Sequence, residues 1–585
     1  MRVLGIEGTA WMASAAVFET AGGPDDSFSS DPDGGSSAGG ASDPDGGSSA
    51  GGASDPDGDS RAVGAFDPDS DHLFIESDAY QPESGGIHPR EAAEHMGEAV
   101  PSVVGAALEH ARERARAAGE DPTVPVDAVA FSRGPGLGPC LRIVGTAARA
   151  LAGSLEVPLV GVNHMVAHLE IGRYFSGFDA PVCLNASGAN AHLLGFHDGR
   201  YRVLGETMDT GVGNAIDKFT RHVGWSHPGG PKVEERAAEG SYLDLPYVVK
   251  GMDFSFSGIM SAAKQAADDG EAVADICFAL QENVFAMLAE VAERALSLTG
   301  TDELVLGGGV GQNARLREML RTMCEDRGAD FYAPDPQYLR DNAGMIAVTG
   351  ARMYAAGDTL DVPDSSVDPN FRPDQVDVTW REAESVARAP VEAQEVQGAE
   401  ATVSFDGDRV LKRRLPKAYR HPELDARLRR DRTVLEARLT SEARRHGVPT
   451  PVVRNVDVRE ATLTLQRVGD ADLAADPTPA RVRAVGEGLA RIHAAGFVHG
   501  DPTTRNVRVD ADREARVFLI DFGLGFHTGH VEDHAMDLHV FEQSIRGTTD
   551  EPRPLVETFE AGYATAGEQA VLARLREIEG RGRYQ

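Results

Sequence analysis

Two groups of side chains on this 585-residue chain have the types and spacing that catalysis requires. The first group is Asn163–His168, with Asp341-Asn342 far downstream. Within it, His164 and His168 are four residues apart. On a helix this spacing places both imidazoles on one face, where they can share one metal ion. The first group is therefore a candidate metal centre, the alternative being two histidines that pack in a core.

The second group has the order and spacing of a protein-kinase active site. Asp501 and Asn506 keep the Asp-x4-Asn spacing of a catalytic loop, and Asp521 begins an Asp-Phe-Gly motif. Upstream, Lys412 ends an apolar strand and is the candidate ATP-pairing lysine, with Glu436 as its ion-pair partner on a helix. Such a set positions ATP phosphates and Mg²⁺, with Asn506 and Asp521 as the metal ligands. It predicts phosphoryl transfer.

This second group departs from ordinary protein kinases in three ways. No Gly-x-Gly-x-x-Gly precedes the lysine, and the candidate ATP loop is instead Gly398, Ala399, Glu400 and Ala401. Gly500 replaces the arginine of the catalytic loop. Only 64 residues follow Asp521, with no Ala-Pro-Glu element, which leaves little room for a peptide-binding lobe. Both a Ser/Thr protein kinase and an ATPase switch fit the motifs, and the missing lobe favours the ATPase.

Glycine turns surround the histidine pair in the sequence. They are Ser187–Asn190, Pro228–Pro231 and Gly307–Val310, and such turns let backbone N–H groups approach a phosphate or ribose closely. Asp217 and Glu234 lie beside them. The pattern predicts a nucleotide pocket near the metal.

A zinc protease is the competing hypothesis for the histidine pair. The His-Glu-x-x-His motif of such proteases requires a glutamate directly after the first histidine as general base. Met165 occupies that place, although the two histidines keep the i, i+4 spacing of the motif. The sequence therefore disfavours a protease.

The composition is strongly acidic, with 92 Asp and Glu against 57 Lys and Arg and a net charge of -35. Because only six of the basic residues are lysine, we interpret the chain as a halophile protein, the alternative being an acidic mesophile protein. This charge disfavours nucleic-acid partners in dilute salt. In molar salt the electrostatic screening length falls to about 3 Å, so local charged patches, and not the net charge, determine whether nucleic acid binds.

Cysteine usage and hydropathy bear on location. The four cysteines form no Cys-x-x-Cys pair, which favours a reducing compartment. We find neither a signal-type N-terminus nor an apolar run of about 18 residues. The expectation is a cytoplasmic protein without a membrane partner.

The motifs lie on two predicted α/β domains. The first spans 1–360, begins with a hairpin over residues 1–20, and carries a disordered insertion at 21–70 built on a repeated Asp-Pro-Asp-Gly-Gly-Ser-Ser-Ala-Gly-Gly-Ala-Ser unit. Apolar strands alternate with amphipathic helices up to about residue 357. Residues 361–395 lose periodicity and predict a linker, and 396–585 form the second domain.

The first domain resembles the universal tRNA threonylcarbamoyltransferase family in its archaeal and eukaryotic branch. The resemblance covers residues 1–20 and 71–357 and is carried by Gly86–Ala93, Asn163–His168, Gly205–Asp209, Asp217-Lys218, Pro228–Pro231, Lys250–Gly258 and Asp341-Asn342. It implies the actin/Hsp70/sugar-kinase fold, in which two ribonuclease-H-like lobes enclose a ligand.

This resemblance also implies the roles of site residues. His164, His168 and Asp341 would hold one divalent metal, Fe²⁺ or Zn²⁺. An adenylate pocket would be lined by Asn185, Ala186, Ser187, Gly188, Ala189, Asp217, Gly230, Glu234 and Asn313. Asn185 stands where the family usually has a tyrosine as a further metal ligand. Since an amide oxygen is the weaker ligand, water can take the open position.

The reaction implied by the resemblance is an acyl transfer. Threonylcarbamoyl-adenylate would bind on the glycine turns, and the metal would act as a Lewis acid. The exocyclic N6 amine of the adenosine 3′ of the anticodon in ANN-decoding tRNAs would attack, and AMP would leave.

The second domain, residues 398–585, resembles the small atypical kinase of the KEOPS complex, the p53-related kinase family. Lys417–Pro422, Arg432–Arg438 and Ile520–Gly525 carry the resemblance, whereas Pro502 and Gln466 depart from the usual Leu and Glu. The two resemblances together imply a fused transferase and kinase/ATPase that uses ATP and Mg²⁺.

Its implied partners are tRNA, threonylcarbamoyl-adenylate and other KEOPS subunits, a small dimerising one and a kinase-docking one. Between Arg409 and Arg445 thirteen basic residues face five acidic ones, so this stretch is a candidate for contact with tRNA phosphates, especially through Arg427, Arg429 and Arg430. Arginines paired with acidic neighbours are the alternative. For the whole chain, the alternative is a signalling Ser/Thr kinase with a metal-binding, actin-like regulatory domain.

Overall fold

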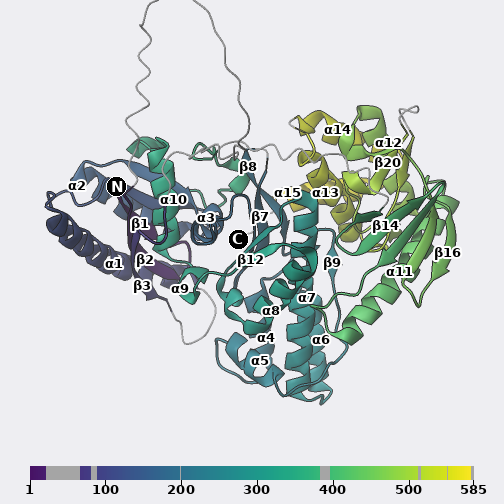
Figure 1. Cartoon of the computed structure of the whole chain (residues 1–585), viewed down its shortest axis with the longest axis horizontal. Helices are drawn as coiled ribbons and strands as arrows, with labels where there is room; N and C mark the ends of the chain where they lie inside the picture. Colours follow the sequence, from purple (N-terminus) through teal and green to yellow (C-terminus); the bar gives the residue numbers. More distant parts are fainter. Residues whose placement is uncertain are drawn as a thin grey trace, which may run out of the picture.

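The computed structural model describes residues 1–21, 66–80, 88–197, 199–381, 395–510, 516–549 and 551–580. Figure 1 shows two α/β lobes from the first part of the chain, and a third unit, in green and yellow, beside the second lobe. This arrangement confirms the predicted fold class, a two-lobed domain followed by a kinase-like one.

The first lobe is built on a five-stranded sheet with the order β3-β2-β1-β4-β5. Strands β1, β2 and β3 pair antiparallel, whereas β4 and β5 run parallel to β1. The sheet is covered by α1 and α2 on one face and by α3 and α10 on the other. The elements are β1 (Arg2–Glu7), β2 (Met12–Glu19), β3 (His72–Ala79), β4 (Ala128–Gly134), β5 (Leu159–Asn163), α1 (Pro89–Ala118), α2 (Gly138–Leu155), α3 (His164–Ser176) and α10 (Ala343–Ala355).

The second lobe repeats this topology. Its sheet has the order β8-β7-β6-β11-β12, again with three antiparallel strands followed by two that run parallel to the first. Such duplication is the ribonuclease-H-like pair expected of the actin/Hsp70/sugar-kinase fold. The elements are β6 (Val182–Ala186), β7 (Ala191–His197), β8 (Arg200–Glu206), β11 (Glu303–Gly307), β12 (Asp330–Tyr332), α4 (Val212–His222), α5 (Gly230–Ala237), α6 (Ser257–Asp268), α7 (Val273–Thr299), α8 (Ala314–Arg327) and α9 (Pro336–Leu339).

Helix α3 lies between the two sheets. Its Ala167 and Ile171 pack into the core of the first lobe, while Met165, Val166 and Leu169 pack against the sheet of the second. A helix with apolar residues all round is expected at such a buried place. The histidines of α3 are therefore positioned at the junction of the lobes.

The third unit has two parts, as a kinase does. Its first part is an antiparallel sheet ordered β13-β14-β15-β17-β16, joined by the long helix α11, and its second part is mainly helical. The elements are β13 (Glu395–Gln397), β14 (Ala401–Asp406), β15 (Arg409–Arg414), α11 (Pro422–Arg445), β16 (Val453–Asp457), β17 (Thr462–Gln466), α12 (Pro479–Ala494), β20 (Val507–Val509), β21 (Val517–Leu519), α13 (Val531–Arg546), α14 (Pro552–Tyr563) and α15 (Gln569–Gly580).

The hairpin predicted for residues 1–20 is present as β1 and β2. Residues 361–381 have little regular structure, yet they pack on the first domain: Arg149 donates to Ser365 Oγ at 2.7 Å, and Val376 joins an apolar cluster with α3. Residues 382–394, and most of the predicted insertion (22–65), lie outside the described residues. Lack of periodicity signals irregular backbone, which does not exclude packing.

Among the described residues, no helix combines the length and apolarity needed to cross a membrane.

Two candidate active sites

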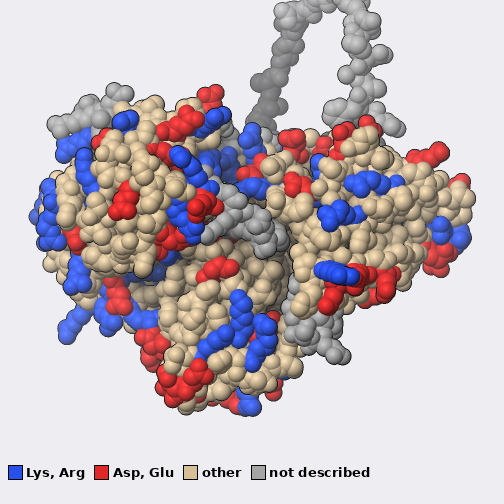
Figure 2. All heavy atoms as spheres, turned by 180° about the vertical axis from the view of Figure 1, so that it is seen from behind, with Lys and Arg blue, Asp and Glu red and all other residues tan. Residues whose placement is uncertain are grey.

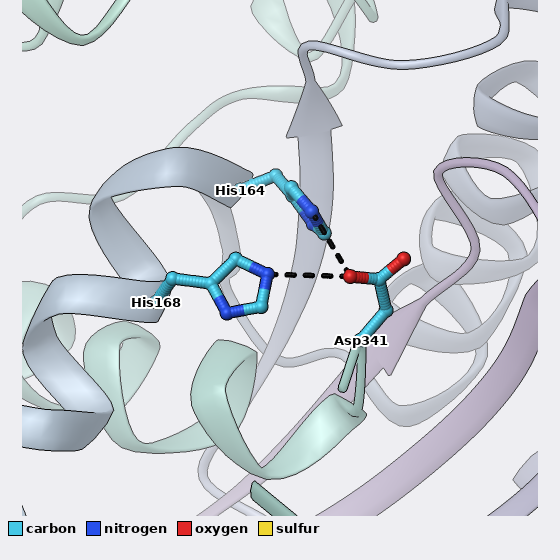
Figure 3. Close-up of side chains that lie close together, drawn as sticks. All are labelled: His164, His168 and Asp341. Atoms are coloured by element: carbon cyan, nitrogen blue, oxygen red, sulfur yellow. Dashed lines mark hydrogen bonds and ion pairs between the residues drawn. The ribbon is translucent and has the colours of Figure 1, made fainter. Parts of the chain in front are cut away.

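The histidine pair and the distant aspartate meet at the lobe junction. Asn163 caps α3, its Oδ1 accepting from the backbone N–H groups of Met165 and Val166, so the helix starts at His164. Asp341 comes from the short segment between α9 and α10. Figure 3 shows both imidazoles directed at one Asp341 oxygen, Oδ1, at 3.5 Å from His164 Nε2 and 3.2 Å from His168 Nε2.

These three groups suit a divalent transition metal. Their donor atoms all lie within 4.8 Å of one another, and two imidazole nitrogens with one carboxylate oxygen are donors that zinc and iron accept. The charges of Glu7 and Asp341 outweigh burial and raise the pKa of His164 to about 10. The two histidines in turn lower the pKa of Asp341 despite its burial. A cation is therefore favoured at this place.

Glu7 is a functional residue that the sequence analysis missed. It is fully buried on β1, and its Oε2 lies 3.2 Å from His164 Nδ1. Its Oε1 accepts hydrogen bonds from the backbone N–H and the hydroxyl of Thr9. A carboxylate behind a metal-binding histidine fixes the tautomer and orientation of the imidazole. The available signal was a glutamate ending the otherwise apolar strand β1.

Glu7→Gln should weaken the affinity for a divalent metal by roughly 10–100-fold, because the amide cannot stabilise the Nδ1–H of His164 as a carboxylate does. Competition with a chromophoric chelator measures this affinity. Glu19→Gln is the matched control, since Glu19 on the neighbouring strand only pairs with Arg2 and Arg114. Equal affinities for wild type and Glu7→Gln would show that Glu7 does not support the metal.

The residues of the implied adenylate pocket form one connected set. The loop Ser187–Asn190 rests on the start of α4, where Gly213 N donates to Ser187 O at 3.3 Å. Across the loop, Gly308 has a positive φ of 84°, and a Cβ there would lie 2.2 Å from Ala186 O. Only glycine therefore allows this close approach of β11 to β6.

Carboxylates hold the other turns of this set. Asp217 Oδ1 accepts from Gly229 N at 2.8 Å, just before Gly230 opens α5. Glu234 Oε1 accepts from Ala314 N at 2.8 Å, next to Asn313, which caps α8. Asp217 thus holds the residue before Gly230, and Glu234 holds the residue after Asn313.

The second site has the geometry of a closed kinase centre. Lys412 Nζ on β15 donates to Glu436 Oε1 at 2.9 Å and pairs with Asp521 Oδ1 at 2.7 Å. Asn506 Nδ2 donates to Asp501 Oδ2 at 3.0 Å. The positive charges of Lys412 and Arg414 outweigh the effect of burial and lower the pKa of Asp521 to about 2. The carboxylate is therefore ionised at neutral pH and can bind a cation. All five residues expected at this site are brought together.

The candidate catalytic base is in contact with the other domain. Arg294 Nη1, from α7 of the second lobe, lies 3.6 Å from Asp501 Oδ2. Gly251 of the same lobe approaches so closely that a Cβ there would lie 3.3 Å from Asp501 Oδ1. Burial raises the pKa of Asp501 to about 6, and Arg294 opposes that rise. The sequence analysis missed both neighbours, since nothing local marks a contact between domains.

The candidate ATP loop also faces the first domain. Gly398 N donates to Ala401 O at 2.9 Å, which closes a tight turn between β13 and β14. Within this turn, Glu400 Oε1 accepts from Arg294 Nη2 at 2.9 Å and pairs with Arg432. The backbone of Gly398–Ala401 keeps its predicted place before Lys412, while Glu400 ties the turn to α7.

Part of the basic stretch from Arg409 to Arg445 is used inside the protein. Arg420 and Arg432 are buried and pair with Glu290 of α7 at 2.7 and 3.1 Å. Lys417 pairs with Glu293. Toward the surface, acidic neighbours pair with Arg427, Arg429 and Arg430. The described pairing matches the alternative of arginines paired with acidic neighbours, and much of it joins the two domains.

Figure 2 shows acidic and basic side chains intermingled over the visible face of the molecule. This mixture agrees with the pairing of Arg427 with Asp244 and of Arg430 with Asp431. The free positive charge available for a polyanion is therefore smaller than the count of arginines indicates.

Glu290→Ala should destabilise the protein by about 3–5 kcal/mol, because the buried guanidinium of Arg420 loses the nearer of its two carboxylate partners, Glu290 and Asp425. The denaturant midpoint of the first unfolding transition, with its slope, measures the loss. Glu239→Ala is the control: it removes an exposed pair with Arg236 and should cost less than about 1 kcal/mol. A similar loss of stability in both variants would show that the interdomain ion pairs stabilise the protein no more than an exposed pair does.

Comparisons with known proteins agree with both sites. Residues 71–348 match the family model described as "TsaD: tRNA N6-adenosine threonylcarbamoyltransferase". Proteins named "Probable bifunctional tRNA threonylcarbamoyladenosine biosynthesis protein" are similar along the whole chain. The one from Haloarcula marismortui is 64% identical over 590 residues, covering 100% of both chains. The one from Methanospirillum hungatei is 47% identical over 584 residues, covering 100% of this chain and 99% of its own. This chain therefore belongs to the family of bifunctional tRNA threonylcarbamoyladenosine biosynthesis proteins.

Proposed function

We propose that this chain transfers the threonylcarbamoyl group of threonylcarbamoyl-adenylate to the N6 amine of the adenosine 3′ of the anticodon in ANN-decoding tRNAs, with AMP as leaving group. The observation that carries the proposal is the cluster of His164, His168 and Asp341, whose two histidines are buried between the two lobes. The end-to-end relationship to bifunctional tRNA threonylcarbamoyladenosine biosynthesis proteins supports it.

In this proposal the residues of the first site have three roles: metal binding, phosphate binding and positioning of the neighbouring turns. His164, His168 and Asp341 would hold one Fe²⁺ or Zn²⁺ ion, which when bound supplies a Lewis acid for the carbamoyl group. The loop Ser187–Asn190, whose carbonyls accept from the first N–H groups of α4, would offer backbone N–H groups of its own to the adenylate phosphate. Asp217 and Glu234 keep the neighbouring turns in place through their backbone hydrogen bonds.

The second domain serves the first as an ATPase in this proposal. A protein kinase must bring a peptide hydroxyl to Asp501, but Arg294 and Gly251 of the transferase domain already lie against that carboxylate. Water is small enough to reach it. ATP and Mg²⁺ would bind through Lys412, Asn506 and Asp521, and the signalling-kinase alternative is disfavoured by the same contacts. The partners would be tRNA and the other KEOPS subunits, in the cytoplasm.

A transfer assay tests the main proposal. The full chain, loaded with Fe²⁺ or Zn²⁺ and supplemented with partner subunits, is given labelled threonylcarbamoyl-adenylate and an ANN-decoding tRNA. We expect label in the tRNA, and none in a matched tRNA whose adenosine 3′ of the anticodon is replaced by guanosine. Label in neither tRNA, from a folded and metal-loaded protein, would refute the transferase function.

A second assay separates the ATPase from the protein kinase. Phosphate release from ATP and phosphate incorporation into protein are measured in parallel, with and without tRNA. We expect release to exceed incorporation and to rise with tRNA. Dominant incorporation that tRNA leaves unchanged would favour the kinase.

A further inference from the structure

The sheet of the second lobe presents a polar pair to the metal-bearing helix α3. Asn185 on β6 and His192 on β7 lie directly opposite each other in the antiparallel register, and both are 4% exposed. Two residues along each strand, Cys183 and Leu194 also face each other and pack with Leu169 of α3. Because alternate residues share a face of a sheet, Asn185 and His192 point to the side of α3 as well.

Polar atoms without partners gather at this place. Among the described residues, neither ring nitrogen of His192, nor Asn185 Oδ1, nor His168 Nδ1 has a hydrogen-bond partner. Leaving a buried polar atom without a partner destabilises a protein, because the atom has lost its hydrogen bonds to water. An apolar pair such as Cys183 and Leu194 would fill the same sheet positions without that cost. A role that needs polar atoms therefore explains the pair better than packing does.

His192 lies on the face of β7 that packs against α3, the helix that carries the two metal-site histidines. Burial lowers the pKa of His192, so its ring is neutral and one nitrogen accepts hydrogen bonds. His192 nevertheless lies outside the group of described ligand atoms found within 4.8 Å of one another. It can thus act on a metal through an intervening molecule.

We propose that His192 and Asn185 together hold a water molecule as a further ligand of the metal. The inference rests on the proposed function, which supplies the metal at His164, His168 and Asp341. The water donates one hydrogen to the neutral imidazole and the other to Asn185 Oδ1, and its lone pair faces the cation. His192 is a positioning residue in this scheme, and the pair stands in for the tyrosine ligand that the family usually has at position 185.

Metal binding by the full-length protein tests this proposal without any substrate. Zn²⁺ affinity is measured by competition with a chromophoric chelator, and the absorption spectrum of the Co²⁺-loaded protein reports the ligand set. His192→Leu should bind Zn²⁺ roughly 10–100-fold more weakly and change the Co²⁺ spectrum, as losses around metal ligands do. His192→Gln keeps a polar atom and should stay within about threefold of wild type, by the same principle.

Leu194→Ala is the matched control, since it disturbs packing on the same face of β7 without removing a polar atom. Wild-type affinity and an unchanged Co²⁺ spectrum in His192→Leu would overturn the proposal. If that variant does not fold, Asn185→Leu is measured in its place. Weaker Zn²⁺ binding with a changed Co²⁺ spectrum would support the proposal, and wild-type behaviour would overturn it. The metal-binding experiment contains neither tRNA nor adenylate. A negative result in it therefore does not refute the transferase proposal, and a negative transfer assay does not change the measured metal affinities.

Discussion

Replacing Asp341 with alanine should abolish tight metal binding and slow threonylcarbamoyl transfer by on the order of 10³-fold, which corresponds to several kcal/mol of transition-state stabilisation. Asp341 Oδ1 lies 3.5 Å from His164 Nε2 and 3.2 Å from His168 Nε2. Its loss leaves two neutral donors, too few to hold a divalent ion against water. Metal content after gel filtration and the initial rate of tRNA labelling measure the two effects.

Asp335→Ala is the control for this variant. Asp335 is exposed, lies six residues upstream at the start of α9, and makes no side-chain cap. It should keep both metal and rate. An Asp341→Ala protein that retained its metal and its transfer rate would show that the triad is not the catalytic centre.

Asp501→Ala should lower ATP turnover by about 10²–10⁴-fold, the range that a positioned general base contributes. Its carboxylate is oriented by Asn506 at 3.0 Å and lies beside the Lys412, Glu436 and Asp521 cluster. Phosphate release measures the loss. Asp431→Ala, which removes an exposed partner of Arg430, should turn over ATP at the wild-type rate. Undiminished turnover in Asp501→Ala would mean that another group activates the water.

The pH dependence of the same reaction follows from the environment of Asp501. Burial and Asp521 raise the pKa of Asp501 to about 6, whereas Arg294 opposes them. A base acts in its ionised form, so turnover should fall as pH drops through about 6. Arg294→Met removes the opposing charge and should move this midpoint to higher pH. An unmoved midpoint would mean that Arg294 does not act on Asp501.

Much of this arrangement could be predicted from local sequence. The spacing of His164 and His168 needs only one helical turn, and the order Lys412, Glu436, Asp501, Asp521 identifies a kinase site without long-range information. The alternating strands and helices likewise indicated an α/β fold. The structure confirms the helix at the histidine pair and the α/β fold, and it brings Lys412, Glu436 and Asp521 into contact.

Contacts between distant segments could not be predicted in this way. Glu7 reaches His164 across 157 positions, and Arg294 reaches Asp501 only because α7 docks on the kinase-like domain. The count of charges in the sequence made the basic stretch that contains Arg420 and Arg432 a candidate phosphate-binding surface. That count does not reveal that Glu290 pairs with both arginines in the folded protein. Burial decides whether an arginine is available, and burial depends on tertiary structure.

The dependence on tertiary structure also applies to Asn185. In the sequence it is only a departure from the usual tyrosine, whereas the strand register places it opposite His192 and on the side of α3. Asn185 therefore has to be considered together with His192, and the sequence at position 185 alone does not reveal this pairing.

The most direct test of the transferase assignment is a single-turnover experiment without ATP. Excess metal-loaded protein, with its partner subunits, is mixed with preformed threonylcarbamoyl-adenylate and an ANN-decoding tRNA, and the modified nucleoside is measured by mass spectrometry. The prediction is one equivalent of threonylcarbamoyladenosine and of AMP with wild type, and none with His164→Ala. Modified nucleoside formed equally by both proteins would contradict the assignment of transfer to the site of His164, His168 and Asp341.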